Sequence, residues 1–285
     1  HLDNPSPPSS NNTSASLVEV AGYILAATAL SALISAPLLV GLLPKATTGL
    51  IVPIAQLTPL IVALVFFAAL KKRPQHRLAR LRDVLALRWA SSTKAIIVGL
   101  GFLIVISALQ ALTALATGQT FAASNDIALA AIAVIPILLM QCVFALGEEF
   151  GWRGWLASRT TGWSFPKAAA TQSIAWTLWH LPVVPLILST ATIEFALAYL
   201  VSIASWAPFF LAVRLRSGSV WPAVVLHGGI NSIRVFFLQS VFAFSEGINW
   251  WVEAAGGILW LAAAAWVMSK SFQLIPCASS QIVKE

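Results

Sequence analysis

Long apolar runs dominate the sequence and restrict the folds open to it. A helix needs about 20 apolar residues to cross the hydrocarbon core of a bilayer, and eight segments approach that length. They are residues 17–43, 49–70, 95–116, 127–147, 168–188, 195–213, 220–244 and 250–268. Only 9% of the 285 residues are charged, against about 25% in a soluble domain. The sequence therefore predicts an all-α polytopic membrane protein with about eight transmembrane helices.

Lysine and arginine lie almost entirely on alternate connectors between these spans. If the connector after the second span is cytoplasmic, fifteen of the 17 basic residues are on the cytoplasmic side, whereas Lys45 is on the other side and Arg234 is within a span. Because cytoplasmic segments are enriched in basic residues, we expect both termini in the cytoplasm. The charges cluster beside apolar spans, which indicates contact with membrane lipid and not with nucleic acid. The alanine-rich, lysine-poor composition favours a bacterial plasma membrane.

Two adjacent glutamates, Glu148 and Glu149, end the apolar run 127–147 in a chain with only ten acidic residues. A carboxylate at the centre of a membrane helix costs about 2.5–3.5 kcal/mol. The pair therefore marks either the point where the helix reaches water or a site of chemistry inside the membrane. Glu149 and Arg153 have the i, i+4 spacing that favours an ion pair. Glu148 lies about 100° around the helix and is left without this partner.

Two histidines, His180 and His227, lie within expected spans. Trp176 precedes His180 by four residues and Asn231 follows His227 by four, so each pair shares a helix face, and Arg234 falls three residues after Asn231 on that same side. Either histidine alone is more simply a packing residue bonded to a backbone carbonyl, and Asn231 alone could hydrogen-bond two helices together.

Together, however, these polar groups gather within about two turns of the cytoplasmic ends of three spans. Intramembrane ionisable groups usually face one another or a cavity. We therefore expect a shared catalytic cavity, open to the cytoplasm, that contains Glu148, Glu149, Arg153, His180, His227 and Asn231.

A glutamate beside imidazoles and an amide donor can hydrolyse a peptide bond. Glu148 would take a proton from water, and a histidine would position that water or protonate the leaving amine. His227 and Asn231 would donate hydrogen bonds to the developing oxyanion. Two other functions remain open: a membrane immunity or scaffold protein without turnover, and a proton-coupled transporter. The transporter is disfavoured because the sequence shows no internal symmetry or paired broken helices.

Three motifs occur in order: Glu-Glu-x-x-x-Arg at 148–153, aromatic-x-x-x-His at 176–180 and His-x-x-x-Asn at 227–231. In this order on successive spans they resemble the CPBP family, which comprises type II CAAX prenyl endopeptidases and bacteriocin-processing and immunity proteins. The resemblance covers about residues 144–233, and Trp176 departs from it where phenylalanine is commoner. It implies an intramembrane endopeptidase that acts on a peptide or lipidated protein.

The resemblance also implies roles for single residues. It makes Glu148 the base that activates water, His180 its partner, and His227 with Asn231 the oxyanion site. The supporting residues would be Glu149, Arg153 and Trp176.

The family is often labelled as metallopeptidases, which raises the question of zinc. A catalytic zinc usually takes three protein ligands and a water, and here His180, His227 and Glu148 could supply three. The helix-spaced pair, however, is His227 and Asn231, and asparagine is a poor zinc ligand. The residues therefore favour a glutamate mechanism without a required cofactor, with zinc as the alternative.

We expect one membrane domain over residues 17–270, with its catalytic core at about 127–245. Residues 1–16, rich in Pro, Ser and Asn, are predicted to form a disordered lead-in, and residues 271–285 a cytoplasmic tail. In the basic connector, basic and apolar residues alternate over 77–85. That pattern suits either an interfacial helix or a plain topogenic loop.

Overall fold

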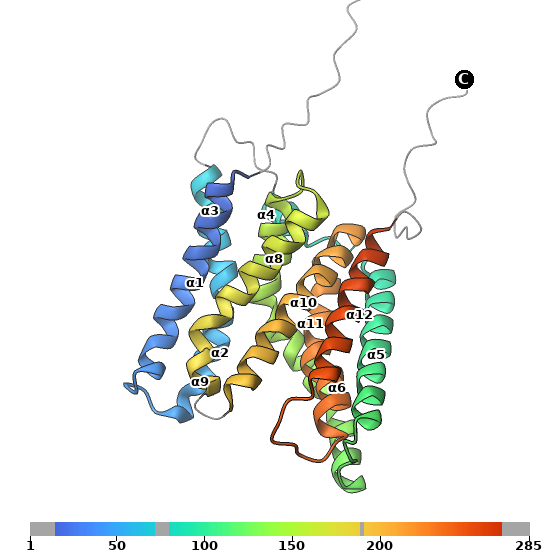
Figure 1. Cartoon of the computed structure of the whole chain (residues 1–285). Helices are drawn as coiled ribbons and strands as arrows, with labels where there is room; N and C mark the ends of the chain where they lie inside the picture. Colours follow the sequence, from blue (N-terminus) through green and yellow to red (C-terminus); the bar gives the residue numbers. More distant parts are fainter. Residues whose placement is uncertain (1–14, 72–79, 90, 189–190, 270–285) are drawn as a thin grey trace, which may run out of the picture.

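The computed structural model describes residues 15–71, 80–89, 91–188 and 191–269, so most of the expected lead-in and the whole tail lie outside the described residues. Figure 1 shows a bundle of helices that run up and down in turn. Within the described residues, six helical segments are long and apolar enough to cross a membrane, which confirms a polytopic all-α membrane protein. They are α1 (Leu17–Leu39), Lys45–Leu70 with α2 (Thr48–Gln56) and α3 (Thr58–Lys71), α5 (Ser92–Ala116), Ser124–Arg159, α10 (Ile193–Ser217) and α12 (Trp250–Met268).

The segment Ser124–Arg159 is one continuous helix with a wide turn inside it. It begins as α6 (Ser124–Glu149), continues through a π-helical segment, Phe150–Leu156, and ends as α7 (Ala157–Arg159). Backbone hydrogen bonds in a π-helix join residues five apart, and such turns are frequent at functional sites.

The other two expected spans are interrupted helices. Residues 168–188 form α8 (Phe165–His180), a 3-10 turn over Leu181–Val183 and α9 (Val184–Leu188). The α-helix stops there because Pro182 and Pro185 lack the N–H that a regular helix needs. Residues 220–244 form α11 (Trp221–Gly229) and two π-helical segments, Ile230–Arg234 and Phe236–Ser240.

Most basic residues of the described part of the chain lie on helix ends and connectors at one end of the bundle, the end at the top of Figure 1. We call this the basic end. The helix ends and connectors there carry Arg80, Arg82, Arg88, Lys94, Arg159, Lys167, Arg214 and Arg216. Lys45 lies at the opposite end, between α1 and α2. The distribution follows the expected pattern, and the side of the membrane on which the basic end lies stays a prediction.

The described part of the basic connector, residues 80–89, packs onto the protein. It contains a short helix, α4 (Leu81–Val84), after which Leu85 and Ala86 are buried. The Ala86 carbonyl accepts a hydrogen bond from the Val220 backbone at 3.0 Å, so this connector is tied to the start of α11. Val84, Leu85 and Ala86 are buried against the bundle here, whereas Trp89 is 56% exposed. Residues 77–79 of the expected interfacial helix lie outside the described residues.

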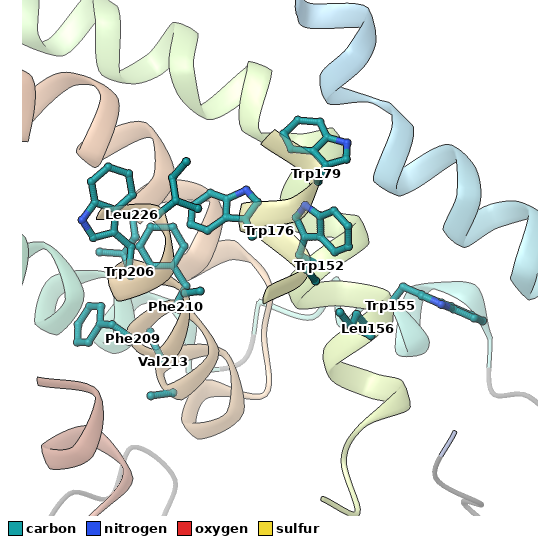
Figure 2. Packing of buried hydrophobic residues seen from close by; sticks show 14 of the residues in the cluster. Trp152, Trp155, Leu156, Trp176, Trp179, Trp206, Phe209, Phe210, Val213 and Leu226 are labelled. Carbon is teal, nitrogen blue, oxygen red and sulfur yellow. The ribbon is translucent and has the colours of Figure 1, made fainter. Parts of the chain in front are cut away.

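The core between α8, α10 and the π-helical segment Phe150–Leu156 is rich in aromatic side chains (Figure 2). The Trp176 ring lies 5.6 Å from that of Phe210 and 6.4 Å from that of Trp206, measured between centroids. Trp152 similarly lies 6.4 Å from Trp179. These rings form the walls around the polar residues that the three motifs contribute.

Candidate active site

Two glycines of α6 and its continuation bring that helix against the break between α2 and α3. A Cβ atom added to Gly147 would lie 2.4 Å from the carbonyl oxygen of Gln56, and one added to Gly151 would lie 2.3 Å from Pro59 Cβ. Only glycine permits backbones to approach so closely. The contact places the side chain of Gln56 beside Glu148.

Glu148 is buried and held by two neutral hydrogen-bond donors. Its Oε1 accepts from Gln56 Nε2 at 2.9 Å, and its Oε2 accepts from Trp176 Nε1 at 2.7 Å. It forms no ion pair with any other residue that the structure describes. Since each carboxylate oxygen has more than one lone pair, the group stays able to accept a further hydrogen bond from water.

Glu149 forms the ion pair with Arg153 that their spacing predicts, with 3.1 Å between Oε1 and Nη1. The same oxygen lies 2.7 Å from His227 Nδ1. Both Glu149 and Arg153 are 0% exposed. One carboxylate thus joins α6, the π-helical segment that follows it and α11.

The guanidinium group of Arg153 lies between two aromatic rings. Its Cζ is 4.2 Å from the ring centroid of Trp176 and 5.0 Å from that of Phe210. A planar, weakly hydrated guanidinium suits such stacking better than a lysine ammonium. Arg153 is also fixed through its backbone, because its carbonyl accepts a hydrogen bond from Arg214 Nε at 2.8 Å.

Both imidazoles are held at Nδ1. His180 Nδ1 lies 2.6 Å from the Trp176 carbonyl oxygen, as expected for a packing histidine, and His227 Nδ1 faces Glu149. Because both partners can only accept, we place the Nδ1 proton on each ring. Neither Nε2 makes a hydrogen bond within the part of the chain that the structure describes. Both rings are therefore oriented, with one nitrogen left for a substrate or water.

Trp176 connects the carboxylate to the two imidazoles. Its ring centroid lies 5.7 Å from that of His180 and 5.3 Å from that of His227, while its indole nitrogen binds Glu148. The structure therefore brings Glu148, His180 and His227 together around one tryptophan.

Asn231 is less closely joined to this group. Its Nδ2 donates to Gln141 Oε1 at 3.1 Å, and Gln141 precedes Glu148 by seven residues, two turns along the same face of α6. Arg234 contacts a different helix from Asn231, since its Cζ lies 4.9 Å from the Trp206 ring on α10. The segment that contains both residues is π-helical, with more residues per turn than the α-helix that their expected common side assumes.

The polar group lies deeper in the bundle than expected. Eleven residues of continuous helix separate Glu148 from Arg159 at the basic end, and seven of them are π-helical. The stretch therefore makes somewhat less than three turns, against the two expected. The difference arises because the helix continues through Phe150–Leu156 instead of ending in water after Glu149.

Sequence reasoning missed two amides in this site, Gln56 and Gln141. Each stands alone as a strongly polar residue inside an apolar run. Polar side chains at membrane depth usually face other polar groups, so that rule would have pointed to both. Their partners, however, come from distant helices that sequence spacing does not relate.

The residues that could hold a metal ion do not form a compact ligand set. Within the described residues, no three His, Cys, Asp or Glu side chains gather in a way that could bind a metal. Of the alternative zinc ligands, His180 and His227 are held at Nδ1 and keep Nε2 open, whereas both oxygens of Glu148 accept hydrogen bonds from N–H donors.

Comparison with known families extends these observations. Residues 129–233, just over a third of the chain, match the family described as Rce1-like, type II CAAX prenyl endopeptidase. No curated protein matches the chain. The matched segment runs from α6 into the π-helical turn after α11 and includes every candidate residue except Gln56. The match confirms the predicted relationship to the CPBP family, at the level of CAAX-type membrane proteases.

Proposed function

From this relationship to a family of peptide hydrolases, we propose that the chain is an intramembrane endopeptidase. Its substrate is a peptide or lipidated protein held at the membrane, cut near its C-terminus. The observation that carries the proposal is the placement of Glu148, a buried carboxylate held by Gln56 and Trp176 beside two oriented imidazoles.

In the first step Glu148 takes a proton from a water molecule. The water oxygen attacks the carbonyl carbon of the scissile peptide bond, and the carbonyl oxygen becomes an oxyanion. General-base catalysis of this kind contributes about 10²–10⁴-fold to the rate. The hydrogen bonds from Gln56 and Trp176 keep the carboxylate in one orientation, so that its remaining lone pairs face the water.

His227 and Asn231 stabilise the oxyanion. Glu149 accepts the Nδ1 proton of His227 and so fixes the orientation of the ring. With a proton on Nε2, the ring donates to the oxyanion. Asn231 adds a second donor when its amide turns from Gln141 to the substrate.

His180 acts at the nitrogen side of the bond. With Nδ1 held by the Trp176 carbonyl, its Nε2 positions the attacking water or delivers a proton to the leaving amine. As the carbon–nitrogen bond breaks, the proton that Glu148 took from the water passes to the amine, either directly or through His180 Nε2. The products are a new carboxylate and a new amine, and every step uses groups of this chain.

We also propose that the basic end faces the cytoplasm, most simply in a bacterial plasma membrane. The support is the enrichment of Lys and Arg at that end, as in cytoplasmic segments generally. A cysteine introduced at Arg82 should then react with an impermeant thiol reagent only in inverted vesicles. One introduced at Lys45 should react only in intact cells.

The test of the proposed activity is cleavage of synthetic peptides by the purified full chain in detergent. The set contains each peptide in two forms, one with a prenylated and one with an unmodified C-terminal cysteine. Each form is assayed with and without a chelator. We expect cleavage that survives chelation, and its loss in Glu148→Gln and in His227→Ala. Glu194→Gln, the same change at an exposed glutamate in the first turn of α10, is the control. Wild-type rates in both site variants would contradict the proposed chemistry.

A further inference from the structure

A cavity separate from the candidate active site lies at the end of the bundle opposite the basic end. Its volume is about 800 Å³, and its walls come from the start of α10, the π-helical segments after α11, residues 242–249 and the start of α12. None of the candidate catalytic residues lines it. The cavity therefore belongs to a separate part of the molecule, near the other surface of the membrane.

Arg234 is the only basic residue among those that line the cavity, and it is 9% exposed. Its Nε makes no hydrogen bond within the described chain, and none of the ion pairs between described residues includes it. The ring of Trp206 supports the guanidinium at 4.9 Å. A buried charge without a close counter-ion is costly, so this position calls for an anionic oxygen.

Two carboxylates also line this cavity, and neither forms an ion pair with Arg234. Glu253 interacts electrostatically with Arg234 but does not reach ion-pair distance, and its Oε2 accepts a hydrogen bond from Ser202 at 3.0 Å. Glu246 is exposed and also lines the cavity. The site thus presents one cationic group and two anionic groups to a ligand.

The rest of the wall combines apolar and polar side chains. The apolar ones include Phe195, Leu238 and Phe242, and the polar ones are Gln119, Thr192, Gln239, Ser245 and Asn249. Trp250 and Trp251 at the start of α12 are 43% and 73% exposed, as in the aromatic belts at the level of lipid headgroups. A ligand here would have its polar part in the cavity and its apolar part in the hydrocarbon.

We propose that this cavity binds the headgroup of an aminophospholipid. The phosphate lies at Arg234, and the primary ammonium donates to Glu253 and Glu246. A guanidinium matches phosphate oxygens well. The two carboxylates favour an ammonium with N–H donors over a quaternary amine, and they disfavour a headgroup that is only anionic. The volume is in the range of about 300–1,000 Å³ usual for small-ligand sites.

The test titrates the full-length protein in detergent with single lipids and follows binding by native mass spectrometry. The lipids are phosphatidylethanolamine, phosphatidylcholine and phosphatidylglycerol, and soluble glycerophosphoethanolamine is the arm without acyl chains. We expect phosphatidylethanolamine to bind about tenfold more tightly than the other three, as for a charge-assisted hydrogen bond.

Two variants and one control assign the contacts. Arg234→Gln should weaken binding of phosphatidylethanolamine and phosphatidylcholine alike, by about tenfold. Glu253→Gln should remove the preference for phosphatidylethanolamine over phosphatidylcholine and leave phosphatidylcholine binding unchanged. Lys45→Gln, a cation at the same end that does not line the cavity, should bind as the wild type does. If Arg234→Gln does not fold, the lipid selectivity of Glu253→Gln still tests the proposal.

Several results would overturn the proposal. Equal binding of the three lipids to the wild type would mean that the cavity does not select a headgroup. If phosphatidylglycerol bound most tightly, the cavity would be a simple anion site. If glycerophosphoethanolamine bound as tightly as phosphatidylethanolamine, the cavity would be a site for a soluble zwitterion. Retained selectivity in Glu253→Gln would place the ammonium elsewhere.

Discussion

Replacing Glu148 and Glu149 one at a time with glutamine should separate catalysis from structure at adjacent positions. The substitution keeps the shape of the side chain and removes its charge. Glu149 is fully buried and holds both Arg153, at 3.1 Å, and His227, at 2.7 Å. Removing one partner of a buried ion pair costs about 3–5 kcal/mol, because the other charge is left uncompensated. We therefore expect Glu149→Gln to lose stability on that scale.

Glu148 forms no ion pair among the described residues, and its two donors are neutral. A glutamine there can still accept from Trp176 or Gln56, but its own NH₂ group would face the other donor. The loss of one such hydrogen bond costs about 1–3 kcal/mol. Glu148→Gln should thus be the more stable variant, while its cleavage rate falls by at least about 10²–10⁴-fold.

The assay compares both variants in one detergent by thermal unfolding, followed through the intrinsic fluorescence of the 12 tryptophans, and by peptide cleavage. Glu194→Gln should match the wild type in both measurements. A Glu148→Gln protein that unfolds earlier than Glu149→Gln would refute the assigned division of roles. So would a Glu148→Gln protein that cleaves peptide at the wild-type rate.

Three further changes test single contacts. Trp176→Phe keeps a ring beside the imidazoles but removes the indole donor to Glu148, and should slow cleavage about tenfold in a folded protein; an unchanged rate would remove this bond from the mechanism. Gln56→Ala should slow cleavage by a similar factor, measured with the same peptide. Gly151→Ala would place Cβ 2.3 Å from Pro59 and should lower stability by about 1–3 kcal/mol, whereas Gly257→Ala, with open space around it, should unfold at the wild-type temperature.

Local spacing predicted much of this molecule. The apolar runs identified the membrane helices, and the i, i+4 rule identified the ion pair of Glu149 with Arg153. Both depend on interactions within one helix or between a helix and its solvent. The same holds for His180, whose Nδ1 faces the carbonyl four residues earlier.

The features that spacing did not predict depend on contacts between helices or on departures from α-helical geometry. Gln56 reaches Glu148 because Gly147 allows α6 to approach the break after α2, and no pattern within either helix encodes that approach. Asn231 contacts Gln141 on α6 whereas Arg234 contacts Trp206 on α10, and the segment that contains both is π-helical. A period of 3.6 residues places side chains correctly only where the helix keeps it.

The ion pair between Glu149 and Arg153, within the continuous helix Ser124–Arg159, has a consequence for how the chain enters the bilayer during synthesis. Glu149 and Arg153 neutralise each other as soon as their helix forms, so neither group must leave the translocon as an isolated charge, which would cost about 2.5–3.5 kcal/mol at the membrane centre. Gln56, the partner of Glu148, has already been synthesised by then, whereas His227 emerges later. When Glu148 and Glu149 are synthesised, each therefore already has, or within four residues gains, a polar partner, and His227 joins Glu149 afterwards.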